Sequence, residues 1–295
     1  MDHTELSRPP GPGALAIAAA RQLAGKRRGE FRRQSAHAPL SVDPARHAAF
    51  SRAVGAGVSD ALHPGYLHAL VFPLVTWLLT RPDAPFPAAG IVHLSNEVTL
   101  EEPVCPGEEL HGVALLERLE EHHAGTVVVA RAEIYQAGRR VFRETAEYLA
   151  RGVWLAGHPD RPERPEFVPP EPTATIGFGP RDNREYARAS GDWNPIHLSR
   201  AAARLGGMRQ PIVHGMNLAS RLASMGGAAL KRPHRWRVEF GAPVPMPGTV
   251  AARVAPAGDG VELLAWRPPR RGRPARPHVT GFVTELAEVE ACLLY

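Results

Sequence analysis

The chain has 295 residues, of which 44% are hydrophobic and 22% charged, so it has enough apolar surface to fold around a core and is not largely disordered. The 30 prolines and 28 glycines indicate frequent loops but show no collagen period. A net charge of +5 favours anionic partners such as phosphates, nucleic acid or an acidic carrier, and a generally basic surface explains the charge equally well.

Cysteine usage and hydropathy indicate the compartment. Cys105 and Cys292 lie far apart without motif spacing, which argues against a disulfide scaffold and fits a reducing environment. The longest strongly apolar stretch, residues 69–79, is too short to cross a bilayer. Residues 14–20 are apolar but lack the flanking features of a signal peptide. A cytoplasmic protein without membrane contact is therefore predicted.

The first half of the chain predicts one helix followed by strands. Residues 1–36 are rich in Arg, Gly and Pro and predict a loosely packed, partly helical N-terminal segment. Residues 66–79 are mostly apolar and predict a helix, which Pro73 should kink or cause to start late. Period-two alternation and turn glycines then predict four strands, over residues 92–100, 111–120, 125–135 and 140–153.

The second half repeats this order after a break. Residues 158–172 contain six prolines and predict an extended linker, because such a stretch suits neither a helix nor a central strand. A helix with apolar residues at helical spacing follows over residues 217–230. Strands are predicted after it, over residues 235–244, 250–255, 261–266 and 278–285. The pattern predicts a duplicated α+β unit.

The stretch that carries chemistry is residues 186–216. Asp192 and His197 lie five positions apart in a segment that contains Gly191 and Asn194-Pro195. Glycine and proline favour a turn there, so both side chains could converge on one water molecule. A carboxylate and an imidazole on one water form a plausible acid–base pair. Asn194 could orient that water or the loop.

Gly215 directly precedes the second predicted helix. Its amide would be unpaired within the helix and near the positive end of the helix dipole, which suits stabilisation of an oxyanion. Taken singly, these residues also have ordinary structural explanations. Ser190 and Asp192 could be N-caps, His197 a hydrogen-bonded structural histidine and Gly215 a packing glycine. The chemical interpretation therefore depends on the whole string.

The whole string resembles the signature of the MaoC-like dehydratases, also called hydratase 2 or (R)-specific enoyl-CoA hydratases. That signature is an aromatic residue, then a small residue and Gly-Asp, any residue, Asn-Pro, an aliphatic residue, His, and a small residue six positions further on. Here it is carried by Tyr186, Ser190, Gly191, Asp192, Asn194, Pro195, Ile196, His197 and Ala203. The family's Pro-Ile-Val-His-Gly-Met follows at 211–216.

The resemblance implies a fold and an activity. The fold is the hotdog, a central helix wrapped by an antiparallel sheet, which occurs here as a tandem (double) hotdog of the α+β class. The activity is the reversible syn hydration of a trans-2-enoyl thioester to the (R)-3-hydroxyacyl thioester. Asp192 and His197 are implied to be the catalytic pair, which acts on one water.

The resemblance also implies roles for the residues around this pair. Asn194 and Ser190 would support it, and the Gly215 amide would polarise the thioester carbonyl. His214 and Met216 are predicted to contact the substrate.

The two halves differ in this chemistry. The predicted domains are an N-terminal segment (1–36), a first hotdog (37–157), a linker (158–172) and a catalytic hotdog (173–295). The first hotdog lacks the Asp–Asn–Pro–His string, and the arrangement resembles the actinobacterial two-hotdog 3-hydroxyacyl-thioester dehydratases. The degenerate half is thought to shape the acyl site in that subgroup, so an acyl-chain site is expected in residues 37–157.

No metal is predicted, because no carboxylate or cysteine spacing supports a site at His111, His122 and His123. No separate cofactor is predicted, because coenzyme A or phosphopantetheine would be part of the substrate. The expected partner is an acyl-CoA or acyl-carrier-protein thioester rather than nucleic acid, and a homodimer is possible. The basic runs 26–33 and 267–276 suit either phosphate contact or solvated loops. Two alternatives stay open: a non-catalytic acyl-thioester-binding protein and a thioesterase on the same fold.

Overall fold

The computed structural model describes residues 2–24, 30–57, 59–163, 165–227, 230, 232–270 and 272–286. The chain divides into two compact units. Unit 1 comprises Met1–Ser41, Leu67–Asn96 and Gly107–Arg164, and unit 2 comprises Val42–Tyr66, Glu97–Pro106 and Pro165–Tyr295. The units therefore do not follow the predicted boundaries, because residues 42–66 and 97–106 group with the second half. Residues 158–163 and 165–172 form neither helix nor strand.

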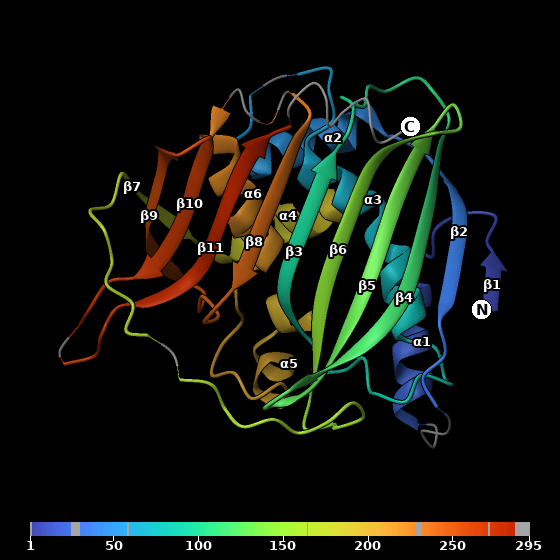
Figure 1. Cartoon of the computed structure of the whole chain (residues 1–295), viewed down its shortest axis with the longest axis horizontal. Helices are drawn as coiled ribbons and strands as arrows, with labels where there is room; N and C mark the ends of the chain where they lie inside the picture. The colour runs from blue at the N-terminus through green and yellow to red at the C-terminus, as the bar shows by residue number, and fades with distance from the viewer. Residues whose placement is uncertain are drawn as a thin grey trace. The chain divides into compact units, whose positions relative to one another are not determined.

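Unit 1 contains a sheet, whose strands can be followed in Figure 1. In spatial order they are β1 (Asp2–Glu5), β2 (Gln34–Leu40), β4 (Leu110–His122), β5 (Gly125–Gln136), β6 (Arg139–Arg151) and β3 (Val92–Leu100), the last belonging to unit 1 up to Asn96. β1 pairs with β2 in parallel, and the pairs β2–β4, β4–β5 and β5–β6 are antiparallel. The four strands predicted in this half are confirmed, with ends shifted by at most two residues.

Helix α3 (Pro64–Leu79) is the helix predicted in the first half. Its side chains are largely buried, and His68 on it lies 2.8 Å from Glu144 on β6. The predicted late start is wrong, since the helix runs through Pro73. Pro64 suits the first helical position, where no N–H is needed, and burial of the apolar side chains outweighs the hydrogen bond that Pro73 removes.

The N-terminal segment is partly helical, as predicted, because it contains α1 (Pro12–Ala24), and most side chains of this helix are exposed. Gln22 of α1 is 5% exposed, and its side-chain Nε2 donates to the carbonyls of Leu79 and Arg81 at 2.9 and 3.0 Å. Its Oε1 accepts from the Ala88 amide. Part of the basic run at 26–33 and Cys292 lie outside the described residues.

Unit 2 contains a set of antiparallel strands and the helix that precedes most of them. The strand order is β8 (His234–Phe240), β11 (Arg276–Glu285), β10 (Gly260–Arg267), β9 (Gly248–Ala257) and β7 (Ala174–Phe178). Helix α6 (Gly215–Met225) packs against β9, β10 and β11. The predicted helix and four strands are confirmed, although the helix and β8 end earlier than expected.

Three further helices of unit 2 were not predicted: α2 (Pro44–Ala53), α4 (Pro180–Ser190) and α5 (Arg200–Leu205). Arg221 on α6 joins α2 and α4, because its guanidinium donates to the Ala53 carbonyl at 3.1 Å and to Asp182 Oδ1 at 2.7 Å. The rings of Phe50 on α2 and Tyr186 on α4 lie 5.7 Å apart, centroid to centroid. These contacts fix the helix from which the motif residues emerge. None of the helices in the described part of the chain is long and apolar enough to cross a membrane.

Candidate active site

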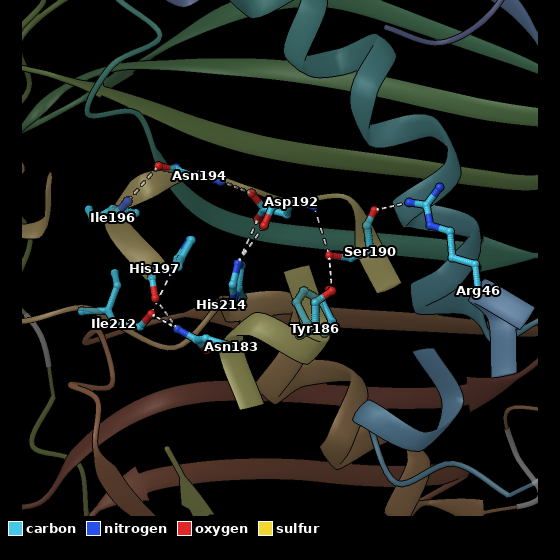
Figure 2. Close-up of polar contacts among 10 residues, drawn as sticks. All are labelled: Arg46, Asn183, Tyr186, Ser190, Asp192, Asn194, Ile196, His197, Ile212 and His214. Carbon is cyan, nitrogen blue, oxygen red and sulfur yellow. Dashed lines mark hydrogen bonds and ion pairs between the residues drawn. The ribbon is translucent and has the colours of Figure 1, made fainter. Parts of the chain in front are cut away.

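The motif residues lie in a loop that begins where α4 ends. Gly191 follows the last residue of α4 and adopts the left-handed conformation (φ 82°), which glycine reaches without strain and which ends many helices. The chain then makes a short 3-10 helix, η1 (Pro195–His197), before α5. Figure 2 shows the side chains of this loop together with those of α4 and of residues 212–214.

Hydrogen bonds to neighbouring residues of the loop hold Asp192. Its amide donates to Ser190 Oγ at 3.2 Å, and its Oδ1 accepts from the Asn194 amide at 3.1 Å. Ser190 Oγ in turn donates to the Tyr186 carbonyl at 2.8 Å. Ser190 is therefore the last residue of a helix and not an N-cap, and it supports the loop that presents the Asp192 carboxylate.

His197 has a tautomer fixed by the fold. Its Nδ1 lies 2.9 Å from the Ile212 carbonyl, which can only accept, so Nδ1 carries the proton and Nε2 is an acceptor. The fully buried Asn183 on α4 donates through Nδ2 to the carbonyls of His197 (2.8 Å) and Ile212 (2.9 Å). Asn183 thus joins the two chain segments that orient the imidazole.

His214 lies beneath the pair and is 1% exposed. Its ring stacks on His197 with centroids 3.9 Å apart, and its Nε2 donates to the Asp192 carbonyl at 3.1 Å. Burial, with a smaller effect of His197, lowers the pKa of His214 to about 3, so the imidazole is neutral. Met216 is also buried, at 5% exposure. Both were predicted to contact substrate, and that contact stays a prediction, while both side chains are buried in the described structure.

Gly215 is the first residue of α6, as predicted. The first amides of a helix have no intrahelical partner and lie at the positive end of its dipole. A Cβ at this position would lie 2.9 Å from Phe240 Cε1, so the close approach of the ring requires glycine.

Asn194, in contrast, is exposed, and its Oδ1 accepts from the Ile196 amide at 3.3 Å. Of its two predicted roles, the contacts favour the orientation of the loop.

The three polar side chains at the centre of the site are close together. One ligand atom each from Asp192, His197 and His214 lies within 4.8 Å of the others, a set that could hold a metal ion. The same spacing suits a water molecule, since two hydrogen bonds of about 2.8 Å from one oxygen reach groups about 4.5 Å apart. The predicted absence of a metal stays a prediction.

Two residues that shape the site were not found from the sequence. Asn183 acts through carbonyls 14 and 29 positions away. Arg46 on α2 acts through carbonyls 143 and 144 positions away, those of Ala189 and Ser190. Neither contact leaves a pattern in the sequence, because both depend on backbone groups brought together by the fold.

Comparisons with known proteins found similar sequences and structures. Residues 160–262 match the family model described as MaoC like domain. The chain is 32% identical over 248 residues to 3-hydroxyacyl-thioester dehydratase X of Mycobacterium tuberculosis. The aligned region covers 84% of this chain and 87% of that protein. The crystal structure of HtdX of M. tuberculosis matches with a TM-score of 0.74 and 28% identity, covering 86% of this chain and all of that one.

A second structure bears on the fold alone. It is a conserved hypothetical protein of M. tuberculosis with a double hotdog fold, 15% identical, with a TM-score of 0.54 over 88% of this chain and 98% of that one. Together these likenesses confirm the predicted tandem hotdog.

Proposed function

The chain belongs to the MaoC-like dehydratase family, and from this premise we propose that it interconverts trans-2-enoyl thioesters and (R)-3-hydroxyacyl thioesters. The family membership makes it a hydro-lyase of the hydratase and dehydratase kind. The substrate class and the roles of the residues below belong to the proposal.

The observation that carries the proposal is the tautomer of His197. Because Nδ1 donates to the Ile212 carbonyl, Nε2 is the nitrogen that could accept from a water, and one ligand atom of the His197 ring lies within 4.8 Å of the Asp192 carboxylate. A water molecule between them donates one proton to each group and turns a lone pair outward. Such a water is oriented as a nucleophile, and effective molarity then lowers the barrier for attack.

Hydration follows from this geometry by a balanced step. The water oxygen forms a bond to C3 of the enoyl thioester, and the π electrons of the C2=C3 bond move toward the thioester carbonyl. One group of the Asp192–His197 pair accepts the proton that the water loses. A proton returns from the pair to C2 on the same face, which gives a syn addition, and dehydration runs the same steps backward.

The negative charge that develops on the thioester oxygen needs a stabilising donor. The Gly215 amide is proposed for this role, since it opens α6 with no intrahelical acceptor. Preorganised donors of this kind contribute about 10²–10³ in rate. Coenzyme A or phosphopantetheine enters as part of the substrate, so the reaction needs no separate cofactor.

The first hotdog is proposed to accommodate the acyl chain. Its helix α3 is apolar and carries no acid–base string, and Phe72 on it is only partly buried. A series of enoyl thioesters of increasing length tests this role. Phe72→Ala should change the preferred chain length while short substrates react at the wild-type rate.

The activity is tested by hydration of crotonyl-CoA, followed as loss of the enoyl thioester absorbance. Wild type should hydrate the substrate, and Asp192→Asn should reduce kcat by about 10²–10⁴, the usual contribution of a general acid or base. Asp259→Asn is the matched control, because Asp259 is an exposed turn residue between β9 and β10.

The same assay separates the alternatives. Release of free thiol without hydration would identify a thioesterase. Saturable binding without turnover would identify an acyl-thioester-binding protein. Equal activity in wild type and Asp192→Asn would remove Asp192 from the mechanism.

A further inference from the structure

Arg46 contacts the end of the helix from which the catalytic loop emerges. The last carbonyls of an α-helix have no intrahelical partner. At the end of α4, Arg46 Nε donates to the Ala189 carbonyl at 2.7 Å and Arg46 Nη2 donates to the Ser190 carbonyl at 2.7 Å. The planar guanidinium suits two neighbouring acceptors at once, which a single ammonium does not. Figure 2 shows this side chain reaching the loop from α2.

The two contacted carbonyls immediately precede the turn that presents Asp192. Gly191 has a left-handed backbone, and a Cβ on it would lie 2.8 Å from Arg46 Nη2. The Asp192 amide is itself bound to Ser190 Oγ. Movement of the last turn of α4 would therefore move the backbone from which the Asp192 carboxylate projects.

The helix that carries Arg46 is held by hydrogen bonds at both ends. Asp43 caps α2 by accepting from the amides of Ala45 (2.9 Å) and Arg46 (3.3 Å). The far end of α2 is held where the Ala53 carbonyl accepts from Arg221. Residues 42–66 and 165–295 belong to the same compact unit, although about half the chain separates α2 from α4.

We infer that Arg46 is a positioning residue for Asp192, supplied to the catalytic unit by the first half of the chain. The inference rests on the proposed hydratase function, because its consequence is a loss of turnover. The guanidinium donates to main-chain carbonyls and not to the Asp192 carboxylate in the hydrogen bonds described above. It acts through the Ala189 and Ser190 carbonyls, and a segment (42–66) outside the matched family region (160–262) is therefore part of the catalytic unit.

The test compares Arg46→Ala and Arg46→Lys in the full chain with Arg52→Ala, which removes an exposed arginine from the last turn of the same helix. Arg46→Ala should lower kcat for crotonyl-CoA by about 10²-fold with KM changed less than twofold, since a displacement of about 1 Å at a reacting group costs that much. The kcat of Arg46→Lys should lie between those of Arg46→Ala and Arg52→Ala. Added guanidinium ion, well below denaturing concentrations, should restore part of kcat in Arg46→Ala.

Three measurements separate positioning from a general structural role. Guanidinium should not restore kcat in Asp192→Asn. Thermal unfolding should show that Arg46→Ala is folded at the assay temperature, and a variant that fails this is replaced in the comparison by Arg46→Lys. Amide hydrogen exchange should be faster in residues 186–199 of Arg46→Ala than in Arg52→Ala.

The outcomes are distinct. A kcat for Arg46→Ala within twofold of that for Arg52→Ala overturns the inference, as does a loss of kcat that guanidinium does not relieve. If wild type does not hydrate enoyl thioesters, the proposed function fails, and the exchange measurement decides the positioning role. Equal exchange in residues 186–199 of the two variants then overturns it.

Discussion

Asn183 offers the sharpest test of how the fold orients His197. Asn183→Asp keeps the size of the side chain but replaces a two-proton donor with a carboxylate that faces the carbonyls of His197 and Ile212. Those hydrogen bonds are 2.8 and 2.9 Å long, and the residue is fully buried. A buried group left without its partner costs about 1–3 kcal/mol, so two such losses reduce the free energy of unfolding by about 2–6 kcal/mol. Since small proteins are stable by about 5–15 kcal/mol, the change is large.

The assay is urea unfolding of wild type, Asn183→Asp and Asn183→Leu at several pH values, with Arg184→Leu as an exposed control on the same helix. Asn183→Leu should lie at the lower end of the range, because it also removes the buried Oδ1, which has no hydrogen-bond partner among the described residues. In Asn183→Asp, burial and the two carbonyls raise the carboxyl pKa in the folded state. That state then binds its proton more tightly than the unfolded state, so the deficit relative to wild type shrinks as the pH falls. A deficit below about 0.5 kcal/mol at pH 7 would refute the reasoning, since surface substitutions alone reach that size.

Three further predictions concern the same unit. Gly215→Ala forces a Cβ against Phe240 and should lower the free energy of unfolding by about 1–3 kcal/mol and kcat by about 10²-fold, measured by urea unfolding and the hydration assay. Ser190→Ala removes the acceptor of the Asp192 amide and should lower kcat by about three- to tenfold in the same assay. Burial lowers the pKa of His63 to about 3, so below its unfolded pKa of about 6.5 the unfolded state binds the extra proton and stability falls with falling pH. His63→Gln should therefore lose about 2 kcal/mol less than wild type between pH 7 and pH 5, measured by urea unfolding at both values.

The residues with local signals were predictable from the sequence. Gly191 was predicted to lie in a turn, and its left-handed backbone suits glycine, while the alternation of apolar residues predicted most strands. Asp192 and His197 were predicted as a pair because the whole string at 186–216 resembles the family signature, and their catalytic roles stay a prediction.

The residues that act over long sequence separations were not predictable. Arg46 and Asn183 bind main-chain carbonyls, and a carbonyl carries no side-chain identity that a sequence could reveal. Unit 2 is built from three separate segments of the chain, and this too was not predictable. Its segment with α2 joins the rest through tertiary contacts such as that of Phe50 with Tyr186. The stacking of His214 on His197 and its burial likewise depend on the folded chain, because the two residues lie in separate segments of the sequence.

The central claim is that Asp192 and His197 act together on one water. It is tested most directly by hydration of crotonyl-CoA in heavy water, with the product analysed by NMR and chiral separation, for wild type, Asp192→Asn and His197→Gln. The account predicts an (R)-3-hydroxy product with one deuterium at C2 added syn, and a loss of about 10²–10⁴ in kcat for either variant. An (S) product, an anti addition, or a variant that keeps the wild-type rate would contradict it.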